Sequence, residues 1–334
     1  MTESLTVVDM HTGGEPVRIV TSGYPPIPPS TILEKRAFVR DNLDHLRKLL
    51  MFEPRGHADM YGALLVEPDM PDADLAVLFM HNEGYSTMCG HAVIALGRYA
   101  VDERIVPARE PLTPVNIQCP CGLVRADVEV TGGKAGAVSF ESVPAFLHTR
   151  DAVLELPGFG EITFDVAYGG AFYALADAGQ FGLRFGRSRA RDFADAATAL
   201  TQAVKSAVPL DHPDDPDLAF LYGSILSDGH GGSGGVASKN VCIFADAQID
   251  RSPTGSGVTA RLAAMHARGA VKPGEERLFE SIAGSRFSGA VAGVTSAGDY
   301  DAVTVRVSGR AYYSGRAEFS VEDDDELGRG FLLR

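Results

Sequence analysis

Short apolar runs that alternate with polar residues or are rich in β-branched residues dominate the chain. Each run is bounded by glycine, proline or other turn residues, a pattern typical of strands joined by tight turns. The predicted strands are 5–10, 17–23, 74–80, 122–130, 136–143, 162–170, 240–250, 289–298, 302–309 and 311–321. The expected fold is therefore rich in β-structure.

Helical spacing of apolar residues is confined to a few segments. The predicted helices are 29–50, 89–101, 192–208 and 255–268. With many strands and few helices, the chain is expected to have an α+β fold.

Two of the predicted helices begin with related sequences, MCGHAVIALGRYAV at 88–101 and PTGSGVTARLAAMH at 253–266. Their offset is close to half of the 334-residue chain. The identical pairs are Gly90 and Gly255, Val93 and Val258, and Ala95 and Ala260. This internal similarity predicts two related domains, in which Cys89 and Thr254 hold equivalent places at the start of a helix.

Length and composition agree with two domains in one water-soluble chain. A chain of 334 residues exceeds the size at which a single core stops growing. Its composition, 45% hydrophobic and 22% charged, includes no apolar run long enough to span a bilayer. Residues 1–16 show no signal-peptide pattern, so we expect a cytoplasmic protein with no membrane partner.

Net charge and cysteine content limit which partners and which cellular compartment are expected. A formal charge of −14 argues against a nucleic-acid partner, because such binding depends on basic residues that displace counterions from phosphates. Cys89, Cys119, Cys121 and Cys242 are too few for a disulfide framework in a chain of this length. A reducing compartment is expected.

Cys89 stands just before a predicted helix, where unpaired amides and the helix dipole favour negative charge. Such a position lowers a thiol pKa from about 8.5 and makes a thiolate base or nucleophile available. The glycines that follow, Gly90 and Gly255, would let a small carboxylate approach the helix amides. The alternative is a buried, inert cysteine, because free cysteine is among the most buried residue types.

Metal and phosphate sites are disfavoured. His81, Cys89 and His91 could ligate zinc, but no further motif completes a set of four ligands. The glycine-rich segment GHGGSGGVASKNV does not fit a phosphate-binding loop, because Lys239 is misplaced and no helix follows. We expect no metal and no organic cofactor, and interpret the glycine-rich segment as a mobile loop or lid.

Five ordered blocks resemble the proline racemase family. They are DMHTGGEPVRIV (9–20), EPRGHADMYGALL (53–65), NEGYSTMCGHAVIALGRY (82–99), DVAYGGAFYA (165–174) and SKNVCIFADAQIDRSPTGSGVTAR (238–261). The resemblance implies a diaminopimelate-epimerase-like fold of two pseudo-symmetric domains, each a curved sheet around a central helix, with the site between them. The domains expected from it are 1–130, completed by about 305–334, and 131–304. It also suggests a homodimer.

Racemases and hydroxyproline epimerases of this family carry one cysteine in each domain, and the two thiols exchange the α-proton. Here Cys89 matches the first cysteine, whereas the second position is Thr254, whose hydroxyl is far too weak an acid to replace a thiol. The pair is similar to that of the family's trans-3-hydroxy-L-proline dehydratases. The resemblance therefore implies conversion of that substrate to Δ1-pyrroline-2-carboxylate.

The resemblance also assigns roles to individual residues. Cys89 would be the base, Asp250 would bind the ring ammonium, and Thr254 would orient water or substrate. Tyr61 and Phe244 would wall the ring pocket, although core packing is the alternative for both. The groups that hold the carboxylate would be Gly90, His91, Gly255 and Ser256. Whether His91 polarises the leaving hydroxyl or tunes Cys89 is left open.

The sequence is also compatible with three other functions. A racemase or 4-hydroxyproline epimerase would use Thr254 or water as its second acid and would lose no water from its substrate. A binding protein would bind proline analogues but leave Cys89 unreactive. A cysteine hydrolase would need a histidine and an orienting group around Cys89, and would form an acyl-enzyme.

Overall fold

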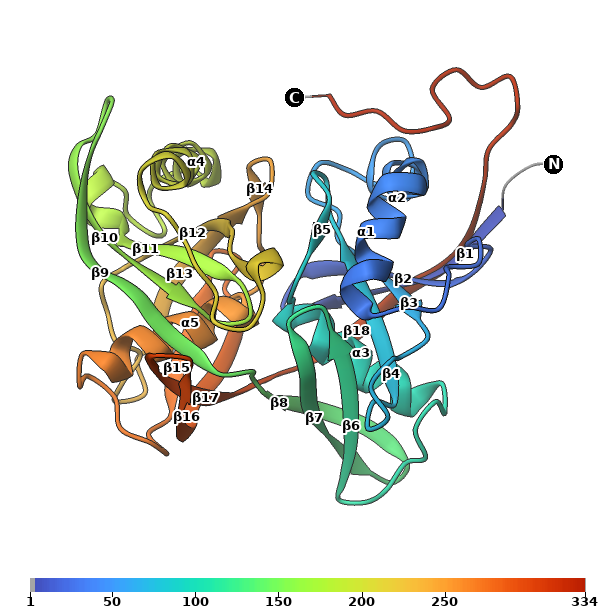
Figure 1. Ribbon diagram of the computed structural model, residues 1–334, viewed down its shortest axis with the longest axis horizontal. Coiled ribbons are helices and arrows are strands. Elements are labelled where there is room, and N and C mark those ends of the chain that lie inside the picture. Colours follow the sequence, from blue (N-terminus) through green and yellow to red (C-terminus); the bar gives the residue numbers. More distant parts are fainter. Residues whose placement is uncertain (1–3, 334) are drawn as a thin grey trace. The chain divides into compact units, whose positions relative to one another are not determined.

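The computed structural model describes residues 4–333 of the chain. It divides into two compact units, one formed by Met1–Val138 with Arg310–Arg334 and the other by Ser139–Gly309. The last segment of the chain returns to unit 1, where its strand pairs with the first strand (Figure 1). Unit 1 is thus discontinuous in sequence.

Unit 1 is a curved sheet around one central helix. The sheet runs in the order β18, β1, β2, β3, β4, β6, β7, with β2–β3 and β4–β6 parallel and the other pairs antiparallel. The helix α3 (Gly90–Asp102) contacts β1, β2, β6, β7 and β18. The strands are β1 (Ser4–Thr12), β2 (Glu15–Ser22), β3 (Gly62–Val66), β4 (Leu75–Met80), β5 (Tyr85–Ser86), β6 (Leu112–Cys119), β7 (Gly122–Thr131) and β18 (Ala311–Ser320).

Unit 2 closes its sheet completely. Strands β9, β10, β11, β12, β13, β15, β16 and β17 pair in that order, and β17 pairs again with β9. The helix α5 (Gly255–Ala267) is buried on every side over its first ten residues and contacts β9, β10, β11, β16 and β17. A helix buried all round is one that lies within the core.

The bounds of the unit 2 strands are β9 (Ala145–Leu156), β10 (Gly160–Tyr168), β11 (Phe172–Asp177), β12 (Leu221–Ser227), β13 (Ser238–Phe244), β14 (Gln248–Ile249), β15 (Arg277–Ser281), β16 (Arg286–Ala297) and β17 (Tyr300–Gly309). The helix α4 (Ala190–Ala207) packs on β12 and β13. Short 3-10 turns occupy Ala178–Phe181 and Pro216–Leu218. In unit 1, β8 (Lys134–Glu141) leads across the boundary into unit 2.

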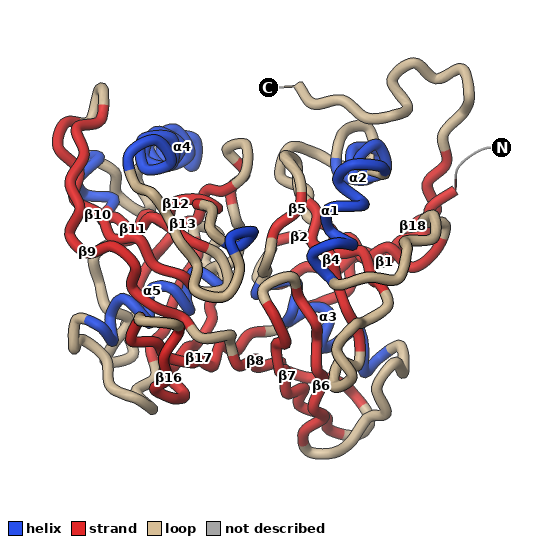
Figure 2. Tube along the Cα trace, in the orientation of Figure 1, coloured by secondary structure: helices blue, strands red, loops and turns tan. Residues whose placement is uncertain are grey.

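The two units repeat one topology. In each, an antiparallel pair (β1–β2 or β10–β11) is followed by a parallel pair (β2–β3 or β11–β12) and then by an antiparallel pair. A two-residue strand, β5 or β14, then leads to the central helix α3 or α5. The predicted α+β fold with two related domains is confirmed, and strands dominate both units (Figure 2).

Some expected elements are divided in the structure. The helix predicted at 29–50 is two helices, α1 (Ile32–Asn42) and α2 (Asp44–Met51), which meet at Leu43 with φ −125° and ψ 14°. Thr31 caps α1 in a capping box with Glu34, and so sets its start. The predicted strand 240–250 is divided into β13 and β14, because Ala245 and Ala247 have positive φ values of 49° and 55°.

Each unit has its own apolar core. One apolar cluster of unit 1 gathers buried residues of β1–β4 with α1 and α2, and one of unit 2 gathers buried residues of β9–β13 with α4. None of the helices in residues 4–333 is long and apolar enough to cross a membrane.

The backbone of α5 lies close to Gly169, which follows β10. A Cβ added to Gly169 would lie 2.3 Å from the carbonyl oxygen of Ser256 and 2.6 Å from the amide nitrogen of Ala260. Glycine at this position therefore lets the first turns of α5 lie directly on the sheet.

The substitution Gly169→Ala should lower the free energy of unfolding by about 1–3 kcal/mol, because the added methyl would push α5 away from the strand. Gly315→Ala is the control, because a Cβ at that β18 position meets nothing within 4 Å. It should leave stability unchanged or raise it by about 0.5–1 kcal/mol. Urea unfolding of both variants measures the difference, and equal midpoints would contradict the close approach.

Candidate functional site

The thiol of Cys89 caps the central helix of unit 1. Cys89 is extended, with φ −147° and ψ 105°, and its Sγ accepts a hydrogen bond from the amide of Ala92 at 3.4 Å. The side chain is buried. The first-turn amides and the helix dipole together favour a negative charge on this sulfur.

His91 lies against the same sulfur. Cys89 Sγ is 3.1 Å from His91 Nδ1, so the ring can exchange a hydrogen bond with the thiol or thiolate. The carbonyl of His91 accepts a hydrogen bond from the Thr12 hydroxyl at 2.8 Å, which ties the first turn of α3 to β1. His91 is therefore in direct contact with the Cys89 sulfur and is placed to influence its reactivity.

Tyr61, just before β3, lies edge-on to His91 with ring centroids 4.8 Å apart. Its hydroxyl shares a 2.6 Å hydrogen bond with Ser86. The ring is also within 6.4 Å of the Phe79 ring and is fully buried. Tyr61 thus packs in the core and supports His91 at the same time.

The remaining histidine and thiols near this helix do not form a metal site. Burial and the guanidinium groups of Arg47 and Arg36 lower the pKa of His81 to about 3, so the ring is neutral near pH 7. Cys119 ends β6 and Cys121 lies in the turn to β7, and burial raises the pKa of Cys121 to about 12. Within residues 4–333, no group of three or more His, Cys, Asp or Glu side chains could hold a metal ion.

Thr254 precedes α5 as Cys89 precedes α3, but its conformation differs. Its φ of 65° and ψ of 96° place a β-branched residue in the left-handed half of conformational space. Such backbone strain costs about 1–3 kcal/mol and persists only where the surroundings hold it. The Thr254 side chain does not cap the helix.

The hydroxyl of Thr254 donates instead to the carboxylate of Asp250 at 2.7 Å. The other carboxylate oxygen accepts the amide of Ser252, also at 2.7 Å. Both Asp250 and Thr254 are buried. A carboxylate and a hydroxyl thus form one rigid polar group at the start of α5.

This group exists because the connection into α5 is longer than its counterpart. Residues 87–89 join β5 to α3, whereas residues 250–254 join β14 to α5. The longer connection supplies Asp250 and the turn that carries it. The internal similarity between the two helix sequences could not reveal this difference, because the similar segments begin only at residues 88 and 253.

Aromatic residues lie beside the start of α5. The Tyr173 hydroxyl shares a 2.7 Å hydrogen bond with Ser256, in the first turn. Phe244, at the end of β13, stacks on Tyr222 with ring centroids 5.1 Å apart. Tyr222 in turn lies edge-on to Tyr173.

Gly90 and Gly255 are the first helical residues of α3 and α5, and both are buried. In unit 1 the structure brings together Tyr61, Cys89, Gly90 and His91, and in unit 2 it brings together Asp250, Thr254, Gly255 and Ser256, with Phe244 nearby through Tyr222. Four residues that contact these side chains were not predicted from the sequence: Thr12, Ser86, Tyr173 and Tyr222. A signal for Tyr222 exists, since a Tyr–Gly pair recurs near the start of the equivalent strands β3 and β12, as Tyr61–Gly62 and Tyr222–Gly223.

The glycine-rich segment joins β12 to β13 and therefore enters a strand rather than a helix. This excludes the phosphate-loop arrangement. Asp228, just before the segment, accepts hydrogen bonds from the amides of His230 and Lys239 at 3.0 Å.

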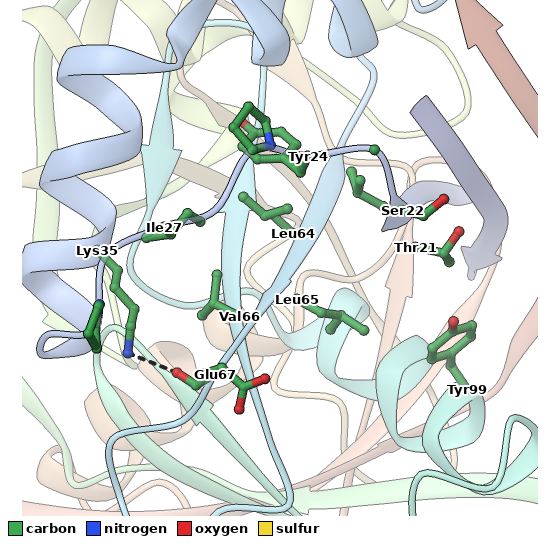
Figure 3. Close-up of a pocket in the computed structure, with 14 residues that line it drawn as sticks. Thr21, Ser22, Tyr24, Ile27, Lys35, Leu64, Leu65, Val66, Glu67 and Tyr99 are labelled. Carbon is green, nitrogen blue, oxygen red and sulfur yellow. Dashed lines mark hydrogen bonds between the residues drawn. The ribbon is translucent and has the colours of Figure 1, made fainter. Parts of the chain in front are cut away.

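Cavities elsewhere in the units contain none of the predicted site residues. In unit 1, a cavity of about 580 Å³ lies beside the ends of β2 and β3 (Figure 3). The buried ammonium of Lys35 donates there to the carbonyl of Glu67 at 2.8 Å. In unit 2, a cavity of about 650 Å³ lies beside the ends of the equivalent strands β11 and β12.

Known proteins resemble the chain along its whole length. The family profile described as proline racemase matches residues 7–332. A trans-L-3-hydroxyproline dehydratase of Xenopus tropicalis is 57% identical over 332 residues, covering 99% of this chain and 95% of the relative. A trans-3-hydroxy-L-proline dehydratase of Homo sapiens is 53% identical over 338 residues, covering 100% and 96%.

A solved structure, a hydroxyproline epimerase of Agrobacterium vitis with bound trans-4-OH-L-proline, is 31% identical, covers 99% of this chain and 96% of its own, and has a TM-score of 0.92. The similarity thus extends over both units, through the cysteine helix as well as the threonine helix. Because the family profile and these relatives span nearly every residue, the chain belongs to the proline racemase family.

Proposed function

We propose that the protein dehydrates trans-3-hydroxy-L-proline to Δ1-pyrroline-2-carboxylate. The observation that carries the proposal is the unlike pair of helix starts, a thiol in contact with an imidazole at α3 and a hydroxyl bound to a carboxylate at α5. The dehydratases of Xenopus tropicalis and Homo sapiens, at 57% and 53% identity, support the same reaction.

In the proposed reaction, Cys89 removes the α-proton as a thiolate. The electron pair of the broken Cα–H bond forms a double bond to the adjacent ring carbon, and the C3–O bond breaks. The hydroxyl takes up one proton, which balances the proton removed by Cys89, and leaves as water, and the resulting enamine tautomerises to the cyclic imine. One molecule of substrate therefore yields one imine and one water, with no change in oxidation state overall.

Unit 1 provides what a thiolate base needs. The Ala92 amide and the N-terminus of α3 stabilise negative charge on Cys89, and His91 Nδ1 lies within hydrogen-bond distance of the sulfur. Removing the thiolate should therefore remove general-base catalysis, which contributes about 10²–10⁴-fold to a rate.

Unit 2 offers no comparable acid at the equivalent position. The hydroxyl proton of Thr254 is donated to Asp250, so the oxygen can accept a hydrogen bond but cannot readily deliver a proton to carbon. A site with one efficient proton carrier favours elimination over inversion. Asp250 would bind the ring ammonium, and Thr254 would orient the substrate or a water.

The remaining roles are proposed on the same basis. The amides of Gly90, His91, Gly255 and Ser256 would hold the substrate carboxylate, since all four lie in the first turns of α3 and α5. Tyr61 and Phe244 would flank the ring. The homodimer, the cytoplasmic location and the lack of a nucleic-acid partner stay predictions from the sequence.

A second candidate is 2-epimerisation of 4-hydroxyproline. It is favoured by the likeness to the hydroxyproline epimerase of Agrobacterium vitis, although that protein is only 31% identical. It would need water to serve as the second acid.

Incubation with substrates in deuterated water separates the two. With trans-3-hydroxy-L-proline, we expect NMR signals of the substrate to disappear and those of a cyclic imine to form. With trans-4-hydroxy-L-proline and L-proline, no elimination is expected. Inversion of the 4-hydroxy compound with deuterium at Cα and no activity on the 3-hydroxy compound would instead identify an epimerase.

Cys89→Ser should lower turnover by about 10²–10⁴-fold while the protein stays folded, because a hydroxyl is a far weaker base than a thiolate. Cys121→Ser is the matched control, since Cys121 lies in the β6–β7 turn of the same unit. Circular dichroism checks the fold, and kcat measured by NMR checks the role. Full activity in Cys89→Ser would remove this thiol from the mechanism.

The substitution Thr254→Cys adds a thiol at the start of α5, so that both central helices begin with one. We expect this variant to lose dehydration and to gain proton exchange with inversion at Cα of 4-hydroxyproline or proline, because a second proton carrier becomes available. Chiral chromatography of the products measures the gain. Loss of dehydration without any inversion would assign Thr254 a role in elimination that a thiol cannot fill.

A further inference from the structure

We infer that Asn240 and Arg261 are positioning residues that hold Thr254 in its strained, catalytically useful conformation. This inference rests on the proposed function, because it assigns the two residues their effect through Thr254. It is carried by a chain of buried hydrogen bonds within unit 2.

The peptide bond between Pro253 and Thr254 is held from both sides. Its carbonyl oxygen accepts a hydrogen bond from Asn240 Nδ2 at 3.0 Å. Its amide donates to the Ser252 hydroxyl at 3.1 Å. With the plane of this peptide fixed, Thr254 keeps its φ of 65° and directs its hydroxyl to Asp250.

Asn240 is itself oriented by a guanidinium group. Arg261 donates to Asn240 Oδ1 at 3.1 Å, so the amide nitrogen must face the Pro253 carbonyl. Arg261 also donates to the Ser238 hydroxyl at 2.6 Å, and lies over the Phe279 ring at 4.9 Å. Arg261 thus holds Asn240 in place from α5, and Asn240 in turn holds the Pro253 carbonyl in the connection before the helix.

The cationic group is buried among neutral partners. Arg261 is 8% exposed, and its guanidinium donates hydrogen bonds to the amide oxygen of Asn240 and the hydroxyl oxygen of Ser238. Burial lowers the pKa of Arg261 to about 10, and the charge of Asp228 opposes that effect. Asp228 is reached through Ser238, whose hydroxyl donates to it at 3.3 Å.

The fold does not need this polar pair, as unit 1 demonstrates. The pairing of β4 with β5 and of β13 with β14 makes Phe79 and Ile243 equivalent, and Asn240 therefore corresponds to Ala76. Counting from Cys89 and Thr254, Arg261 corresponds to Leu96 in α3. Ala76 and Leu96 are both fully buried.

The polar pair occurs in the same unit as the strained backbone. Unit 1 has an apolar pair at these places and an extended Cys89 with φ −147°. Unit 2 has the polar pair and a strained Thr254. A polar link that occurs only where the strained residue occurs is better explained by that residue than by the fold.

The double variant Asn240→Ala with Arg261→Leu copies unit 1 and tests the inference. It removes both polar partners at once, so neither is left buried without the other. We expect a folded enzyme whose kcat for dehydration falls about 100-fold, as displacement of a catalytic geometry by about 1 Å can cause. We expect KM to change less than threefold.

A second readout separates positioning from general damage. The rate at which the α-proton of L-proline exchanges in deuterated water reports on Cys89. In the double variant this rate should fall much less than the kcat for dehydration. Ser224→Ala is the matched control, because it removes a buried polar contact of unit 2, the 2.7 Å bond to Thr201, and copies Ala63 of unit 1. It should retain normal kcat.

Asn240→Asp decides the matter if the double variant does not fold. Aspartate keeps the volume and an acceptor for Arg261, but it loses the donor to the Pro253 carbonyl, so kcat should fall as in the double variant. Normal kcat in a folded Asn240→Asp or double variant would overturn the inference, as would an equal loss of exchange and dehydration. Failure of the wild-type protein to dehydrate trans-3-hydroxy-L-proline would instead count against the proposed function.

Discussion

The hydrogen bond from the Thr254 hydroxyl to the Asp250 carboxylate is the interaction around which the start of α5 is organised. It joins two buried polar side chains that would be costly to leave unpaired. It also determines where the hydroxyl proton lies, and therefore what the hydroxyl can do. The longer connection before α5 and the strained backbone of Thr254 both serve to form this contact.

The two units show how one topology can hold two chemical environments. The strand order and the central helix are repeated, so the helix amides recur at equivalent places in each unit. The side chains at those places differ: a thiol touches an imidazole in unit 1, and a hydroxyl touches a carboxylate in unit 2. Reactivity is thus assigned locally, by the residues just before each helix.

Much of the fold could be predicted because its periodicity is strong. The helix starts at Gly90 and Gly255 were recognisable from glycine and small residues following Cys89 and Thr254. The division of 29–50 at Leu43 was not, since apolar spacing continues across it and only the backbone turns there. Likewise, the contact of Tyr173 with Ser256 joins residues far apart in sequence, and no local pattern records it.

The unequal connections before the central helices have a consequence for how such a protein can diversify. The closed sheet of unit 2 contacts α5 along its length, and the loop 250–254 is itself largely buried and bound to β13 by the hydrogen bond from Asn240 to the Pro253 carbonyl. A change of side chain at position 254 can therefore alter the polar group within an unchanged loop, whereas a change of loop length would break these buried contacts.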